Sequence, residues 1–232
     1  MTYIQKKLKL DDAAIEKIAQ AVQRAESKTS GEIFVAAAKE SARYSFRELL
    51  FSVLASLIVF CALLPFASGI ESALKSRYWF VSDWQLPAFY GITIFGLIAV
   101  LFYFAGIPFI DRLIVPRTIQ NRCVNSRALR CFAENGVYKT RENSGILIFI
   151  SLLERQVRII ADSGISAKIS DDLWKLIADE LAEGIGKRDA ASAIIGAIEK
   201  CGELLAQHFP AEADNPDELS NNIIFLENPE WT

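Results

Sequence analysis

Two long apolar runs without a charged residue constrain this chain more than any other feature of its sequence. They cover residues 49–70 and 86–110 of 232, and neither contains Asp, Glu, Lys, Arg or His. About 20 apolar residues form a helix long enough to cross a bilayer core of about 30 Å. Two buried helices of a soluble protein are rarely both so long and so uninterrupted. We therefore predict a hairpin of two transmembrane helices within residues 41–115.

The basic residues near the ends of the two runs predict the orientation of this hairpin. Lys39, Arg43 and Arg47 precede the first run and five arginines follow the second, whereas the connector carries only Lys75 and Arg77. By the positive-inside rule, both termini then lie in the cytoplasm and the connector lies outside. The expected location is the bacterial inner membrane, with the chain as a multi-pass protein. Because a charged stretch precedes the first run, that run does not have the form of a cleaved signal peptide.

Residues that flank the runs are expected to contact lipid headgroups. The connector carries Tyr78, Trp79 and Trp84, aromatic residues of the kind that settle at the membrane interface. The arginines that follow the second run each gain about 1 kcal/mol near an anionic surface. We assign headgroup contact to the first three of this series, which runs Arg112, Arg117, Arg122, Arg127 and Arg130.

The remaining composition excludes several classes of function. The net charge of −3 provides no basic field, so nucleic acid is not an expected partner. Four cysteines without a CxxC pair and a single histidine, His208, exclude the usual zinc sites and give no base for a nucleophilic cysteine or serine. We expect the cysteines to be reduced and to act as small hydrophobic residues. Because neither apolar run contains a charged residue, transport through the hairpin is not predicted.

The segments on either side of the hairpin have the patterns of helices and strands. Before it, Asp11 is placed to cap a helix, and residues 32–38 form the apolar run of a buried strand. After it, residues 118–134 have a helical rhythm, and residues 145–150 and 156–161 predict an antiparallel pair of strands.

Two further helices and a tail complete the prediction. Ser170 begins the first helix, with Leu173, Ile177 and Leu181 facing inward, and Asp189 caps the second, which stops at Pro210. Residues 211–232 are acidic, without a basic residue, and are predicted to be mostly extended. Residues 1–40 and 116–210 would each expose an apolar sheet face if folded alone, so we predict that they join into one layered α/β domain.

Several phrases of the soluble segments, in this order and spacing, resemble the TPM domain family. They are SGEI at 30–33, GVYKTRE at 136–142, GILI at 145–148, SLLERQVRI at 151–159, ADSGI at 161–165 and HFP at 208–210. The resemblance implies a small mixed sheet with helices on both faces. It does not imply one activity, because TPM domains are linked to phosphatase chemistry, photosystem repair and receptor modulation. Relatives often carry Asp-x-Ala-Gly before the first helix, where this chain has LDDAA at 10–14, and this departure weakens the transfer of a phosphatase or metal site.

The ends of the predicted strands supply the candidate metal ligands. Asp162, directly after a strand, is placed to bind a divalent cation such as Ca²⁺ or Mg²⁺, with Glu32 or Glu142 as further oxygen ligands. The alternative interpretation is that Asp162 caps a turn by accepting hydrogen bonds from the amides that follow it.

Four basic residues are candidates for contact with phosphate or with an acidic partner: Lys139, Arg141, Arg155 and Arg158. The alternative is that strand alternation simply places these charges on a solvated face.

Two functions from different classes fit these observations. The first, which we favour, is a membrane-tethered cytoplasmic domain without enzymatic activity, which supports assembly or quality control of a membrane complex. It requires no cofactor, and its partners are the lipid bilayer and another membrane protein or complex. The alternative is a weak phosphohydrolase that uses a carboxylate-bound divalent metal, with Asp162 and Glu32 as ligands. The sequence does not indicate the oligomeric state.

Overall fold

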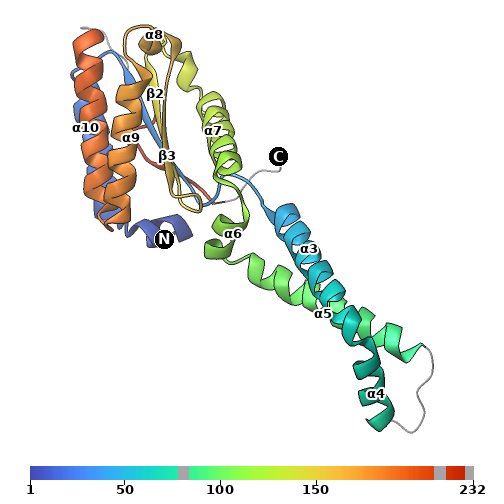
Figure 1. Ribbon diagram of the computed structural model, residues 1–232. Coiled ribbons are helices and arrows are strands. Elements are labelled where there is room, and N and C mark those ends of the chain that lie inside the picture. Colours follow the sequence, from blue (N-terminus) through green and yellow to red (C-terminus); the bar gives the residue numbers. More distant parts are fainter. Residues whose placement is uncertain (78–83, 212–217, 228–232) are drawn as a thin grey trace. The chain divides into compact units, whose positions relative to one another are not determined.

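The computed structural model describes residues 1–77, 84–211 and 218–227 (Figure 1). The chain forms two compact units. The first combines Met1–Arg43 with Thr118–Thr232, and the second is Tyr44–Arg117, which contains both apolar runs. The second unit is therefore an insertion in the first.

The first unit is built on a mixed sheet of four strands within the described residues. The strands are β1 (Glu32–Ala38), β2 (Gly145–Ser151), β3 (Gln156–Ala161) and β4 (Ile224–Leu226), in the order β3-β2-β1-β4. β1 runs parallel to both of its neighbours, with Glu32 opposite Gly145 and Ala36 opposite Ile224. β2 and β3 are antiparallel, as the sequence predicts.

Helices cover both faces of this sheet, so the predicted fold class is confirmed (Figure 1). On one face, Ile33 and Val35 of β1 pack in a core with α2 (Asp12–Glu26), α9 (Asp171–Gly186) and α10 (Ala190–His208). On the other face, Phe34 and Ala36 pack with α7 (Arg117–Glu134). This alternation along β1 is the two-residue period of a strand with both faces buried.

Side-chain capping explains where two of the predicted helices begin. Asp11 accepts a hydrogen bond from the Ala14 N–H at 2.7 Å, and Ser170 accepts one from the Asp172 N–H at 3.3 Å, as predicted. Asp189 is the N-cap residue of α10, as predicted, but its side chain makes no capping hydrogen bond to the described residues. The short elements α1 (Tyr3–Leu8), η2 (Val137–Lys139) and α8 (Ser163–Ser166) carry too little periodicity to be predicted.

Two further differences from the sequence prediction concern α9 and the tail. Leu173 is 43% exposed, because the buried stripe of α9 begins at Trp174 and continues through Ile177 and Leu181. The tail is not separate from the domain, since Ile224–Leu226 forms β4 at the edge of the sheet. A three-residue strand that pairs with a segment far away in the sequence leaves no local pattern to recognise.

The second unit contains two helical segments that are long and apolar enough to cross a membrane. The first, Ser45–Ala73, comprises α3 (Ser45–Leu63), η1 (Leu64–Phe66) and the start of α4 (Ala67–Arg77), and the second is α5 (Gln85–Ala105). Only 11% of the most apolar window of each is buried. The predicted second span ran to residue 110, but α5 ends at Ala105, and α6 (Pro108–Ile114) follows as a separate helix.

Inside this unit, α3 and α5 pack against each other through a few specific contacts. The Tyr90 hydroxyl donates to the Leu63 carbonyl at 3.1 Å, and the Phe60 ring meets the Tyr90 ring edge to face, with centroids 5.8 Å apart. Ser52 and Ser56 are fully buried, and such small side chains allow helices to approach each other closely.

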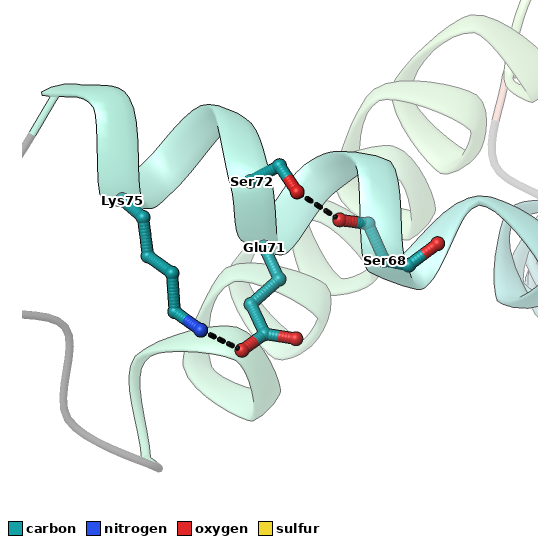
Figure 2. A network of polar contacts seen from close by, with 4 residues as sticks. All are labelled: Ser68, Glu71, Ser72 and Lys75. Atoms are coloured by element: carbon teal, nitrogen blue, oxygen red, sulfur yellow. Dashed lines mark hydrogen bonds and ion pairs between the residues drawn. The ribbon is translucent and has the colours of Figure 1, made fainter.

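The first part of the predicted connector is helical, because α4 extends to Arg77. Figure 2 shows its polar contacts: Lys75 lies 2.6 Å from Glu71, and the Ser72 hydroxyl donates to the Ser68 carbonyl at 2.8 Å. Of the predicted interfacial aromatics, Trp84 is exposed, while Tyr78 and Trp79 lie outside the described residues.

Candidate functional site

The three predicted metal ligands lie at one end of the sheet, where β1 and β2 begin and β3 ends. Glu32 is buried, and its Oε2 accepts the Leu219 N–H at 3.3 Å. Glu142 Oε2 accepts the Ser30 hydroxyl at 2.9 Å. Both carboxylates therefore have protein donors as partners.

Asp162 has the capping geometry that was the alternative interpretation. Its Oδ1 accepts the Ser163 N–H at 2.6 Å at the start of α8, and its own N–H donates to the Gly145 carbonyl at 2.9 Å. In the part of the chain that the structure describes, no group of three or more His, Cys, Asp or Glu residues is placed to hold a metal ion. The structure thus brings the three carboxylates to one edge without forming a three-ligand site from them.

The four predicted anion contacts do not converge. Lys139 lies beside the ring of Tyr138, at 5.7 Å from its centroid. The Arg141 N–H donates to Glu218 Oε2 at 2.9 Å. The Arg158 guanidinium donates to the Val157 carbonyl and to Gln156 Oε1, both at 3.2 Å. Arg155 lines a cavity together with residues of other elements.

The arginines assigned to lipid headgroups differ in exposure. Arg117 and Arg122 are exposed, and Arg112 in α6 is half-buried. Arg127, further along the same series, is buried in α7. The count of basic residues alone could not show this burial.

A buried polar network that sequence reasoning missed lies at the opposite, carboxyl end of β1 and β2. Glu154 Oε1 accepts the Ser41 N–H at 3.0 Å, its Oε2 accepts the Ser151 hydroxyl, and the hydroxyls of Ser41 and Ser151 are 2.7 Å apart. All three residues are buried. The network ties the segment before the insertion to the turn between β2 and β3. The spacing S-x-x-E in the turn was its only signal in the sequence.

A cavity of about 470 Å³ lies next to this turn. It is lined by the end of α1, the β2–β3 turn and the turn between α9 and α10. Its lining includes the buried apolar residues Leu8, Ile150 and Val157 and four basic residues, Lys7, Lys9, Arg155 and Arg188. The carboxyl ends of parallel strands are where α/β proteins usually bind ligands.

The cysteines take no part in either region. All four are free, and Cys201 is fully buried in α10. Burial raises the pKa of the Cys201 thiol to about 12, which keeps it protonated and unreactive at neutral pH. His208 is the exposed last residue of α10.

Comparison with known proteins is consistent with this architecture. The family model of the TPM domain matches residues 111–204. Among solved structures, the chain is similar to the NMR structure of the BA42 protein from the psychrophilic bacterium Bizionia argentinensis. The TM-score is 0.54 at 20% identity, over 93% of this chain and 94% of that chain. No curated protein matches the chain. The match over residues 111–204 thus confirms the resemblance of the sequence motifs to the TPM domain family, and the solved structure shares the fold.

Proposed function

We propose that this chain is a membrane-tethered TPM domain that acts as a non-enzymatic interaction factor for a membrane complex, at the cytoplasmic face of the bacterial inner membrane. The observation that carries the proposal is the apolar exterior of the inserted unit. Phe95 at the middle of α5 is 76% exposed, and Ile58 in α3 is 71% exposed. Such surfaces are costly in water but suit hydrocarbon, where a helix satisfies all of its backbone hydrogen bonds internally.

The insertion supports a tethering role. The domain continues from Arg43 into the inserted unit and resumes at Thr118, so both ends of the hairpin are covalently joined to it. With an even number of crossings, the two halves of the domain lie on the same side of the membrane. The basic residues near both junctions favour the cytoplasmic side.

The exposed side of α9 supports an interaction role. Leu173 and Leu176 are 43% and 57% exposed on this helix, and their spacing of three residues places them on one side of it. Exposed apolar side chains that lie together mark surfaces for partners.

The membrane part of the proposal is tested on the full-length protein in isolated membranes. We expect it to resist extraction at alkaline pH and a C-terminal fluorescent-protein fusion to fluoresce, as it does only in the cytoplasm. Extraction of the protein, or a dark fusion that is present at normal level, would contradict the tethering or the orientation.

The interaction part is tested by a photo-crosslinking residue at position 176 of the full-length protein. We expect one discrete crosslinked membrane protein, which disappears in L173S, whereas K175S, on the same helix, retains it. Metal-dependent hydrolysis of a phosphomonoester by the purified protein, lost in D162A, would instead establish the phosphohydrolase and overturn the non-enzymatic role.

A further inference from the structure

We propose that the cavity beside the β2–β3 turn binds a small organic phosphate through Lys7, Lys9, Arg155 and Arg188. This site goes beyond the tethering role, because it adds a soluble or lipid-borne ligand to the domain. Three observations carry it: the charge of the lining, the backbone conformation of the charged residues, and the apolar floor.

The charge of the lining is entirely positive. Four basic residues and no Asp or Glu line the cavity in the described structure. None of the four has a side-chain hydrogen bond or ion pair to another described residue. Asp189, the neighbour of Arg188 in sequence, lines the separate groove between α9 and α10. Four like charges gathered without a counter-charge repel each other, and a multivalent anion removes that repulsion.

The backbone of three of these residues is held in the left-handed region. Lys9, Arg155 and Arg188 have φ of 56°, 53° and 68°. Only one other non-glycine residue of the described chain has a positive φ, Asn143, a residue type that tolerates this conformation. Strained residues of this kind concentrate at functional sites.

At each of these three positions, glycine would adopt the left-handed backbone conformation more easily. Lys9 and Arg188 follow α1 and α9, where the next N–H groups return to the Gln5 carbonyl at 2.9 Å and the Gly184 carbonyl at 3.3 Å. This is the hydrogen-bond pattern of helix ends at which glycine predominates. Arg155 closes the tight turn between β2 and β3, with its N–H 3.3 Å from the Leu152 carbonyl. Three separate turns therefore each place a strained basic residue at one cavity.

The apolar part of the lining indicates an organic ligand rather than a bare anion. Leu8, Ile150 and Val157 contribute apolar surface to the lining, which is called the apolar floor here. The volume of about 470 Å³ is within the range of small-molecule sites, about 300–1,000 Å³. Guanidinium groups pair with phosphate oxygens through two parallel hydrogen bonds, which favours a phosphate group over a single carboxylate.

The test is calorimetric titration of the full-length protein in phosphatidylcholine nanodiscs with phenyl phosphate and with inorganic phosphate. We expect saturable binding of both, at least tenfold tighter for phenyl phosphate because its ring contacts the apolar floor. R155G and R188G should each weaken the binding of phenyl phosphate at least tenfold. K187A removes a neighbouring charge that pairs with Glu183 outside this cavity and should leave the affinity unchanged. No binding of either probe, or an equal loss in K187A, would overturn the proposal.

Two further arms separate the alternatives. R155G and R188G should unfold at the same or a higher temperature than the parent protein, because glycine relieves the left-handed strain; earlier unfolding would show that these residues serve the fold instead. In nanodiscs that contain phosphatidylglycerol, loss of phenyl phosphate binding would identify a lipid headgroup as the source of the phosphate, and unchanged binding would identify a soluble ligand.

Discussion

The packing of α10 against α2 predicts opposite effects for the same substitution at two glycines of one helix. Gly202 of α10 is buried, and a Cβ added to it would lie 2.6 Å from the Cβ of Ala25 and 3.2 Å from its Cα. Ala25 belongs to α2 and has no flexible end that could move aside. Gly196, on the same helix, has nothing within 4 Å of such a Cβ.

The magnitudes follow from two opposing contributions to the free energy of unfolding. Alanine is favoured over glycine in a helix by about 1 kcal/mol, which should stabilise G196A. In G202A the same gain is opposed by overpacking, which costs about 1–3 kcal/mol. Because the propensity gain is common to both variants, their difference in stability isolates the overpacking cost, with G202A the less stable by about 1–3 kcal/mol.

The measurement is urea unfolding of the full-length protein in detergent micelles, followed by the fluorescence of Trp174, which is 3% exposed in α9. Replacing the other tryptophans by phenylalanine makes the signal specific to this domain. A shift of the unfolding midpoint without a change of slope reports the stability difference. The exchange A25G/G202A should recover most of the loss. Equal midpoints for G196A and G202A would refute the close approach of α2 and α10.

Three further perturbations test other parts of the structure. F95R places a charge at the centre of α5 and should oppose membrane insertion by about 2.5–3.5 kcal/mol, seen as release of the protein at alkaline pH; unchanged retention would contradict a lipid-facing Phe95. I223A removes a buried side chain next to β4 and should cost about 2–5 kcal/mol, while a midpoint like that of the half-buried Ile224→Ala would argue against docking of β4. Because burial raises the pKa of Cys201 from 9.0 to about 12, the unfolded chain loses this proton first, and stability should fall as the pH rises between these values. C201A should remove that contribution; the same pH dependence in C201A would assign it to other groups.

The sequence predicts the central elements of the fold because their signals are local. Every residue of β1 is buried, and the apolar run at 32–38 ends at Lys39. Both ends of this strand could therefore be predicted from the sequence. β4 depends on pairing with β1 across most of the chain, and its three residues alone do not specify a strand. The same limit applies to α9. Either Leu173 or Trp174 can share the inward face with Ile177, and the helical period alone does not decide between these adjacent positions.

The candidate sites show the same difference between local and long-range signals. Sequence reasoning placed Asp162, Glu32 and Glu142 at strand ends, where they lie, but it could not show that one oxygen of each already accepts a hydrogen bond from the protein. The cavity was missed because its basic residues come from three distant turns. Lys9 and Arg188 occupy left-handed positions at helix ends, where glycine is the usual residue. Because neither is glycine, the turns that bring them together could not be recognised in the sequence.

The insertion of the hairpin also determines the order in which this protein can mature during synthesis. β1 leaves the ribosome before the hairpin, while both of its neighbours in the sheet, β2 and β4, follow it. At ~5–20 residues per second, translation of residues 44–117 takes roughly 4–15 s, during which β1 has no strand to pair with. In the proposed tethered protein, residues 44–117 would enter lipid before the second half of the domain is synthesised. A hairpin that fails to insert should then leave an incomplete domain as a substrate for proteases, which would couple the abundance of the folded domain to membrane insertion.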